Sequence, residues 1–392
     1  MTLLWEPEKA LADVATGQAP DHSAAYAALL AKGSVARYSK GEGQGTWGIF
    51  SHAEIEKAAL DTKSLSNVTV PPGTPRILPL MADPPEHGAY RRLVNPFFAP
   101  SKISAAEEVM RPIAAEMIDA LIGQGDADFA SYAYHFSTQT LCRFLRVTAD
   151  WRIYNDWSSE MERLTGSGTA TPGSSLPMDH FLKVVPYIQD LIDDRRANPG
   201  DDVVSGFIAG EIDGQKLDDQ AVTGLIIALI LAGRSTTASG IGNFVRRLAT
   251  DRKLQDFLRA NPDRIKDAVE ESLRIESPQQ EMPRMAVQDI EVGGETIKAG
   301  DSVFLNYGSA NLDPTRWENP DVFDIDRKSK LHFAFGRGIH QCFGAPLGRM
   351  QMRVTAEELL RRTTAFELAG DVERHVWPRL SVEKMPLRFT AA

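Results

Sequence analysis

The sequence predicts a mainly α-helical protein with a small, segregated β region. Apolar residues recur at helical spacing over most of Glu86 to Arg195 and again from Leu217 to Thr250. Extended patterns are confined to short stretches such as residues 45–52, 290–309 and 374–389. The chain lacks the regular alternation of strand and helix that a doubly wound sheet needs. We therefore expect helices to form the body of the molecule.

Composition limits the classes of function. The chain has 392 residues, a hydrophobic fraction of 43% and a net charge of −10. These values are typical of an ordinary globular protein, and scattered arginines in an acidic chain argue against nucleic-acid binding. The pattern has no fixed-period repeat and no clean linker, so we expect a single domain over residues 1–392.

The chain is expected to be cytoplasmic and free of a membrane anchor. Acidic residues and a proline occupy the first ten positions, where a secretory signal has a basic end and an apolar run. The longest apolar run, Leu225 to Ala232, is far shorter than the roughly 20 residues that span a bilayer. The two cysteines, Cys142 and Cys342, are expected to stay unpaired in a reducing compartment, with Cys142 in the core of a helix.

The first part of the chain alternates short elements with loops. We expect a helix over Ser23–Lys32, a strand within Gly45–His52 and a helix over His52–Leu60. A proline- and glycine-rich loop follows from Asn67 to Pro85, and the next helix starts with Glu86 in its first turn.

The second part of the chain carries the long helix. Its predicted range, Leu217–Thr250, has acids at the start and arginines near the end, in agreement with the helix dipole. Before it, the glycine- and serine-rich connector Thr165–Pro177 suits a mobile lid. After it, we expect a helix that ends near Ile275, a hairpin that turns at Gly293-Gly294, and an extended tail from Arg374 to Phe389.

Cys342 lies in an unusual setting, the stretch FAFGRGIHQCFG at residues 333–344. Only His332 and His340 are near it in sequence and no second cysteine is, so a closed zinc site is not expected. A haem ligand is the remaining interpretation, because a thiolate on haem iron needs close approach to a flat ring and shielding from protons.

The neighbours of Cys342 suit that interpretation. Gly336 and Gly338 permit a turn with positive φ, which lets backbone N–H groups point at the sulfur. Gly344 has no side chain to collide with a porphyrin, and Phe335 is placed to cover the sulfur. The helix that begins near Ala345 adds its positive end to the stabilisation of the thiolate.

The pattern Phe335-x-x-Gly338-x-His340-x-Cys342-x-Gly344 resembles the haem-binding signature of the cytochrome P-450 superfamily, in its soluble bacterial type. The resemblance implies the fold of that family, with haem b between the long central helix and the helix after the cysteine loop. It implies Cys342 as the iron ligand and Phe335, Gly336 and Gly344 as haem contacts.

Three further motifs occur in the order expected of that family. Glu271 and Arg274 match its Glu-x-x-Arg, which implies a structural network with the segment at residues 318–327. For the haem propionates, the resemblance implies four groups: His87, Arg91, Arg284 and His340. The segment LAGRSTTASG resembles the oxygen-binding element, which implies that Ala232 and Gly233 leave room for dioxygen and that Thr236 hydrogen-bonds it.

The chain departs from the family pattern at Ser235, which stands where the family has an acid. A carboxylate is a convenient relay for the protons that O–O cleavage needs, whereas serine relays them only through water. Three consequences stay open: a water or a substrate group replaces the acid, electrons are coupled loosely to product, or peroxide replaces the reductase. Arg234 beside it is expected to form a structural ion pair.

For the substrate pocket we expect contacts from four segments: the loop Asn67–Leu80, the connector Thr165–Pro177, the inner face of the long helix and the stretch Gln279–Met282. The candidates are Ala228, Leu231, Thr237, Gln280, Met282 and Leu78. The polar run PQQEM at residues 278–282 favours a small substrate with an oxygenated end, because unpaired amides in a dry pocket are unfavourable.

The resemblance implies monooxygenation, with hydroxylation and O-demethylation equally open. The chain has no dinucleotide-binding motif and no length for a flavin domain, so the expected partners are a ferredoxin and its NAD(P)H-dependent reductase. Arg92, Arg337 and Arg349 are expected to cluster on the docking face of a monomeric protein. Two alternatives are a peroxide-driven oxygenase and a non-catalytic haem sensor or carrier.

Overall fold

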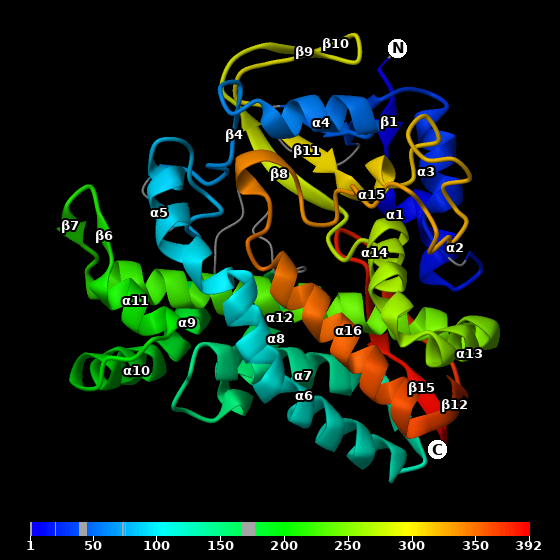
Figure 1. The fold of residues 1–392 in the computed structure, drawn as a ribbon. Coiled ribbons are helices and arrows are strands. Elements are labelled where there is room, and N and C mark those ends of the chain that lie inside the picture. The colour runs from blue at the N-terminus through cyan, green and yellow to red at the C-terminus, as the bar shows by residue number, and fades with distance from the viewer. Residues whose placement is uncertain (1, 20, 39–44, 73, 75, 166–176) are drawn as a thin grey trace.

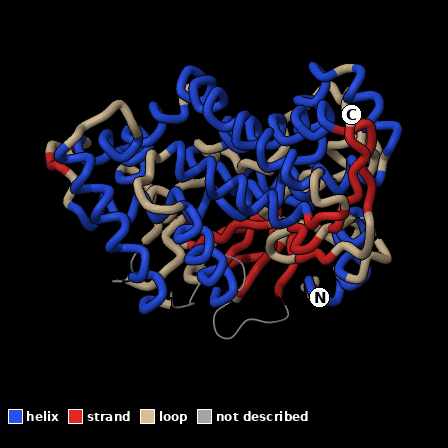
Figure 2. The backbone as a smooth tube through the Cα atoms, turned by 90° about the horizontal axis from the view of Figure 1, so that it is seen from below, coloured by secondary structure: helices blue, strands red, loops and turns tan. Residues whose placement is uncertain are grey.

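The computed structural model describes residues 2–19, 21–38, 45–72, 74, 76–165 and 177–392. Helices form most of this part of the chain, and the strands gather at its margins (Figure 1, Figure 2). The predicted fold class, mainly α with a small segregated β region, is confirmed.

The N-terminal helices are short. They are α1 (Pro7–Ala10), α2 (Ala12–Ala15), α3 (Ser23–Leu30) and α4 (His52–Leu60). The last two confirm the predicted helices. α4 starts where it does because the Ser51 hydroxyl accepts a hydrogen bond from the backbone N–H of Glu54 at 3.4 Å, which satisfies an otherwise unpaired donor.

The largest sheet joins the N-terminal strands to strands from the last third of the chain. Its order is β1 (Leu4–Trp5), β2 (Val35–Tyr38), β3 (Thr46–Ile49), β11 (Ser302–Asn306), β8 (Glu281–Ala286), β4 (Leu65–Ser66). β11 runs parallel to β3 and antiparallel to β8. The sheet therefore holds the segment after Arg274 against the N-terminal part of the chain.

The predicted hairpin is confirmed in part. β9 (Ile290–Val292) pairs with β10 (Glu295–Ile297) around Gly293 and Gly294, whose φ angles of 57° and 83° favour glycine. The extended stretch after it, β11, leaves this hairpin and joins the large sheet.

Helices cover most of the range predicted to be helical. They are α5 (Glu86–Val94), η1 (Asn95–Phe98), α6 (Pro100–Ile122), α7 (Phe129–Phe144), α8 (Trp151–Thr165), α9 (Met178–Phe181), η2 (Leu182–Val184), α10 (Val185–Ala197) and α11 (Val203–Ala209). Short strands that the pattern did not reveal are β5 (Asp126–Asp128), β6 (Glu211–Ile212) and β7 (Gln215–Lys216). The predicted connector Thr165–Pro177 lies outside the described residues except at its two ends.

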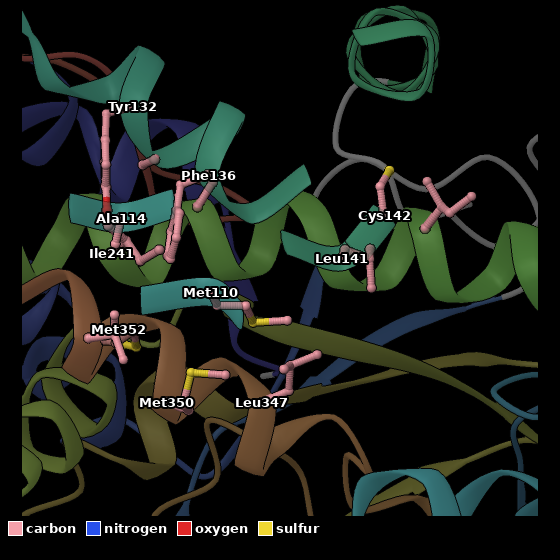
Figure 3. Packing of buried hydrophobic residues seen from close by; sticks show 14 of the residues in the cluster. Met110, Ala114, Tyr132, Phe136, Leu141, Cys142, Ile241, Leu347, Met350 and Met352 are labelled. Atoms are coloured by element: carbon pink, nitrogen blue, oxygen red, sulfur yellow. The ribbon is translucent and has the colours of Figure 1, made fainter. Parts of the chain in front are cut away.

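α12 (Asp219–Thr250) crosses the middle of the molecule (Figure 1). Its most apolar window has a mean hydropathy of 1.6, which is high enough for a membrane span, but 56% of that window is buried inside the protein. α12 packs against α7 on one side and against α16 (Ala345–Arg362) on another, with Leu141, Ile241 and Met352 among the packed side chains (Figure 3). It is therefore a core helix.

The remaining elements complete the helical body and its edge. They are α13 (Arg252–Ala260), η3 (Pro262–Arg264), α14 (Ile265–Ile275), α15 (Tyr307–Ala310) and η4 (Gly338–His340), then β12 (Thr363–Leu368), β13 (Glu373–His375), β14 (Ser381–Lys384) and β15 (Pro386–Ala391). β12, β15 and β5 form one small sheet, and β13 pairs with β14. The predicted end of a helix near Ile275 and the extended tail are both confirmed.

Candidate active site

The cysteine loop is held in shape by its own backbone. The N–H of Gly336 donates to the carbonyl of Phe333, and the N–H of Cys342 donates to the carbonyl of Phe335, both at 2.8 Å. Gly336 and Gly338 have φ angles of 67° and 71°, as the sequence predicted. A Cβ on Gly338 would also lie 2.8 Å from the carbonyl oxygen of Ala59. The loop thus needs glycine for its conformation and for its approach to α4.

Cys342 forms no disulfide, and part of the residue is exposed. Burial raises the pKa of this thiol, and the N–H groups of Gly344 and Ala345 act against that increase, together with the charges of Arg91 and Arg349. The donors that reach the sulfur therefore follow the cysteine rather than precede it. The other cysteine, Cys142, is buried in α7 as expected.

Gly344 and Phe335 define the surroundings of the sulfur. A Cβ on Gly344 would lie 3.7 Å from Sγ of Cys342, with no other described atom nearby, so the glycine keeps this side open. The Phe335 ring lies beneath the guanidinium of Arg349, whose Cζ is 4.3 Å from the ring centroid. It also comes within 3.9 Å of the position that a Cβ on Gly348 would take. Phe335 thus packs between the loop and the first turns of α16.

Two histidines from distant segments meet beside the loop. The ring of His87, on α5, lies 4.1 Å from that of His340, between centroids. The Nε2 atoms of both are buried and have no hydrogen-bond partner in the described chain. Burial, followed by the charges of His87, Arg284 and Arg91, lowers the pKa of His340 to about 3. Burial and the Arg91 charge likewise lower the pKa of His87.

Two arginines complete this group of four. Nη1 of Arg91 donates to the carbonyl of Gln341 at 2.8 Å, and its Cζ lies 5.2 Å from the centroid of Phe343. Arg284 is 4% exposed, and its Nη1 donates to the carbonyl of Pro283 at 2.8 Å. Both act on His340 electrostatically, so the structure brings together all four groups that the sequence singled out.

These surroundings fit a flat macrocycle with two carboxylate arms and a central metal. Two buried imidazole nitrogens and two guanidinium groups converge beside the loop without a carboxylate of the described chain bonded to those imidazoles. Hydrogen bonds to propionates would satisfy these otherwise costly orphaned nitrogens. The sulfur of Cys342 supplies the ligand that haem iron takes in thiolate proteins.

On α12, two residues of the predicted oxygen-binding element are accessible. Ala232 is exposed, and Thr236 is half-buried with its hydroxyl donating to the carbonyl of Ala232 at 2.7 Å. Ser235 is 4% exposed, and its carbonyl accepts from the hydroxyl of Ser239 at 2.6 Å. These side-chain bonds to carbonyls four residues earlier are typical of helix segments that bend.

Two neighbours on α12 face other helices. A Cβ on Gly233 would lie 3.0 Å from Cδ2 of Leu141, so the missing side chain gives room to α7 rather than to a ligand. The Thr237 hydroxyl lies 3.9 Å from the position of a Cβ on Gly348, so this half-buried side chain reaches the first turns of α16. The helical period places these residues on different faces from Ala232 and Thr236.

The assignment of Gln280 to the substrate pocket is wrong. Gln280 is 1% exposed, its Oε1 accepts from the hydroxyl of Tyr26 at 2.8 Å, and its Nε2 donates to the carbonyl of Ser277 at 2.5 Å. The neighbouring Glu281 is bonded to the hydroxyl of Tyr38. Pairing of β8 in the large sheet turns these polar groups toward the N-terminal part of the chain. They therefore give no reason to expect a polar substrate.

The other pocket candidates are consistent with an apolar surface. Leu78, Leu231 and Met282 are half-buried, and Ala228 is 6% exposed. Leu78 and Leu231 pack against the largest core cluster, and Met282 packs against the cluster around the large sheet.

Glu271 and Arg274 form a buried ion pair, as the motif implied. Each is 1% exposed, with two hydrogen bonds of 2.9 and 2.8 Å between them. Oε1 of Glu271 also accepts from Nε of Arg327 at 2.9 Å, and Nη1 of Arg274 donates to the carbonyl of Asn311 at 2.7 Å. The pair joins α14 to the segment that leads into the cysteine loop.

Sequence reasoning missed several contacts of these residues. In each of these contacts the two partners are far apart in the chain. Examples are Arg91 with the carbonyl of Gln341, Gly233 with Leu141, and Arg234 with Glu162. A spacing motif carries no signal for such contacts.

The family model described as Cytochrome P450 matches residues 177–380. Among curated proteins, the chain is 31% identical to the mycinamicin IV hydroxylase/epoxidase of Micromonospora griseorubida over 376 residues, which cover 93% of this chain and 94% of that protein. It is 32% identical to the erythromycin C-12 hydroxylase of Saccharopolyspora erythraea over 339 residues, 84% and 85% of the two chains.

Solved structures give the same result. The cytochrome P450 CYP109Q5 from Chondromyces apiculatus superimposes with a TM-score of 0.84 at 30% identity, over 94% of this chain and 95% of that chain. CYP108D1 from Novosphingobium aromaticivorans superimposes with a TM-score of 0.85 at 28% identity, over 100% of both chains.

Proposed function

Because this chain belongs to the cytochrome P450 family and is a haem-thiolate monooxygenase, we propose that it inserts one oxygen atom of O2 into a small, largely apolar organic substrate, with haem b as its cofactor. The observation that carries the proposal is the free thiol of Cys342 beside the two buried, unpartnered imidazole nitrogens of His87 and His340. When bound, the haem supplies the iron that activates O2, with a thiolate ligand that favours O–O cleavage.

Each residue of the chain has a role in this proposal. Cys342 binds the iron, and the N–H groups of Gly344 and Ala345 stabilise the charge on its sulfur. His87, Arg91, Arg284 and His340 hold the propionates. Gly336 shapes the loop, Gly344 keeps the sulfur accessible and Phe335 packs beneath Arg349.

With haem bound, Ala232 would leave room for O2. The Thr236 hydroxyl, which donates to the Ala232 carbonyl, would be able to donate to a ligand instead. Ser235 is buried and carries no carboxylate, so we infer that protons reach Thr236 through water or a substrate group. Loose coupling of electrons to product is the alternative outcome.

For the reaction we favour hydroxylation over O-demethylation, because one curated relative is named a hydroxylase and the other a hydroxylase/epoxidase. The substrate is expected to be mostly apolar. Leu78, Ala228, Leu231 and Met282 are the apolar pocket candidates, while the polar groups at residues 279–281 bond to the chain itself. This replaces the expectation of an oxygenated substrate end.

We infer that electrons come from a ferredoxin and its NAD(P)H-dependent reductase. Of the three arginines expected on the docking face, Arg337 is paired with Glu56 at 3.0 Å and Arg349 with Glu270 at 2.5 Å. Arg92 is exposed and its charge is the best placed to meet an acidic partner. Charge reversal in R92E should slow reduction by ferredoxin and weaken its dependence on ionic strength, whereas an unchanged rate would remove Arg92 from the interface.

The remaining inferences concern the chain as a whole. One domain over residues 1–392 is supported by core clusters that join distant parts of the chain. The largest takes members from Tyr90 to Leu387, and two others join Trp5 to Leu312 and Val35 to Phe333. We infer a cytoplasmic monomer, with α12 as a core helix.

The test is incubation of the purified holoprotein with NAD(P)H, ferredoxin, its reductase and ¹⁸O2 over a panel of apolar compounds preselected by a blue shift of the Soret band. A product that carries one ¹⁸O atom per molecule supports monooxygenation. C342S should lose the red-shifted Soret band of the thiolate carbonyl complex, and H135A serves as the matched control. Product formed with hydrogen peroxide alone would favour the peroxide-driven alternative, and no NAD(P)H consumption with any compound would favour a sensor or carrier.

A further inference from the structure

A buried arginine lies in the turn of α12 that carries the accessible residues Ala232 and Thr236. Arg234 is 3% exposed and stands between Ala232 and Thr236 in sequence. Residues two apart on a helix point about 160° from each other, so Arg234 faces nearly opposite to both accessible residues. Arg234 therefore lies on the face of α12 opposite to Ala232 and Thr236, and it does not reach the side where a ligand would bind.

The Arg234 guanidinium is bonded along one face of α8. Nη1 donates to Oε1 of Glu162 at 3.0 Å and Nη2 donates to the hydroxyl of Ser159 at 2.5 Å. Nε and Nη2 both donate to Oδ1 of Asn155, at 3.2 and 3.1 Å. Four hydrogen bonds to residues on three successive turns set the position of α12 relative to α8 in both translation and rotation.

The guanidinium is also enclosed on its other sides. Its Cζ lies 4.7 Å from the centroid of the Tyr134 ring, on α7. Glu162 makes a second ion pair, 3.5 Å long, with Arg379 from the turn between β13 and β14, and Arg379 lies 3.7 Å from Glu383. Two arginines and two glutamates thus balance in charge and join α12, α7, α8 and the C-terminal hairpin.

The bonds of Arg234 lie beside a helix segment in which two side-chain hydroxyls bond to main-chain carbonyls. The hydroxyls of Thr236 and Ser239 donate to the carbonyls of Ala232 and Ser235, which weakens the main-chain ladder on that segment. A helix with such a segment needs an external contact to hold its hydroxyl in one place. Because misplacement of a reacting group by about 1 Å can lower a rate by about 100-fold, the contact matters for the reaction.

We propose that Arg234 is a positioning residue, which acts through its bonds to α8 to hold the turn from Ala232 to Thr236 in place. The inference rests on the proposed monooxygenase function and deepens it by naming what fixes the Thr236 hydroxyl. Arg234 itself touches neither substrate nor cofactor.

The test compares R234K with R246K, a matched variant on the same helix. Arg246 is also a largely buried arginine, paired with Glu276 at 2.5 Å about three turns further along. Lysine keeps the charge but loses the planar fork of donors, so only one of the four Arg234 bonds survives in R234K. Both variants are expected to unfold at a lower temperature than the parent protein.

The two variants should differ in local motion. In R234K, amide hydrogen exchange at residues 236–240 is expected to rise about tenfold, because this segment opens more easily. In R246K the increase should be confined to residues beyond 243. This measurement works with holoprotein in the absence of any substrate or reductase.

The two variants should also differ in how tightly NAD(P)H consumption is coupled to product formation. R234K is expected to form about tenfold less product per NAD(P)H consumed, while the substrate dissociation constant from optical titration changes by less than about twofold. R246K should keep the parent ratio. E162Q removes only the charge of Glu162, the carboxylate partner of Arg234. It should raise amide exchange at residues 236–240 and lower the product formed per NAD(P)H, as R234K does. E276Q, which does the same to the partner of Arg246, is its control.

The proposal is overturned if R234K and E162Q exchange at the parent rate over residues 236–240, or if their coupling ratio equals that of R246K and E276Q. If R234K does not fold, E162Q decides. A parent protein that forms no product with any donor would contradict the proposed function, while the exchange comparison would still decide the role of Arg234.

Discussion

The imidazole rings of His87 and His340 lie 4.1 Å apart between centroids, and neither buried Nε2 atom has a hydrogen-bond partner in the described chain. One ring comes from α5 and the other from the cysteine loop, so the two segments meet through groups that require an acceptor from elsewhere.

We expect H87A and H340A each to release haem faster. A hydrogen bond to a charged group contributes about 1.5–3 kcal/mol, so haem loss to an acceptor protein should accelerate by about 10- to 100-fold. The control is H135A, which removes a histidine of α7 that packs against Trp151 of α8. Haem transfer from H87A and H340A at the rate of H135A would contradict the assignment.

Stability should fall as the pH rises from about 4.5 to about 8, because of Glu281. Burial raises the pKa of Glu281 to about 8, from an ordinary 4.5, with the hydrogen bond from Tyr38 acting in the opposite direction. The folded state prefers the neutral acid, so this contribution to stability is complete below pH 4.5 and is lost as the pH rises through about 8.

E281Q keeps a neutral side chain at every pH. In the parent protein, the Glu281 contribution lowers the free energy of unfolding by up to about 1.4 kcal/mol per pH unit between about pH 4.5 and 8. This decrease should be absent in E281Q. Urea unfolding at a series of pH values measures both slopes, and parallel curves for the two proteins would refute the prediction.

Removal of one partner of the Glu271–Arg274 pair should strongly destabilise the protein. E271A leaves the guanidinium of Arg274 buried at 1% exposure without its carboxylate, which costs about 3–5 kcal/mol. Urea unfolding and the yield of haem-loaded protein are the measurements.

The control for E271A is E54A, which removes the ion pair between Glu54 and Lys57. The two charged groups lie 2.9 Å apart, and the lysine side chain is 72% exposed. An exposed pair of this kind contributes only about 0–1 kcal/mol. Equal losses in the two variants would show that burial does not determine the strength of the Glu271 network.

Gly233 should not tolerate alanine. Alanine would gain about 1 kcal/mol in helix propensity, but its Cβ would lie 3.0 Å from Leu141, and such overpacking costs about 1–3 kcal/mol. We expect G233A to lower the thermal midpoint, and L141V to restore part of the loss in the double variant.

G224A is the matched control on the same helix, because a Cβ on Gly224 would have no described neighbour within 4 Å. It should be neutral or stabilising. If G233A is as stable as G224A, the contact with Leu141 has been overestimated, and the glycine serves another purpose.

Local sequence was sufficient to predict the residues of the candidate site. The cysteine loop, the Glu271–Arg274 pair and the helix that carries Thr236 are each defined by spacings of a few residues, and such spacings translate directly into geometry. Helical periodicity similarly predicted the ranges of α3, α4 and α12. These features carry the resemblance to the cytochrome P450 family, and the family model and the curated relatives confirm it.

The directions of single side chains could not be obtained in this way. Gln280 turns toward Tyr26 because β8 joins a sheet with β11 and β4, strands from other parts of the chain. Thr237 faces Gly348 and Gly233 faces Leu141 because α16 and α7 pack on those sides of α12. The face that an element buries depends on what packs against it.

Arg234 shows most clearly what the sequence determined and what only the tertiary structure decided. From the sequence it could be recognised as a charged residue inside an apolar helix, for which a structural ion pair was expected. Only the tertiary structure selected Glu162 and Asn155, which lie 72 and 79 positions away, as the groups that satisfy it. A buried charge must find partners, but which partners it finds is decided by the packing of helices, because contacts between distant segments leave no trace in local spacing.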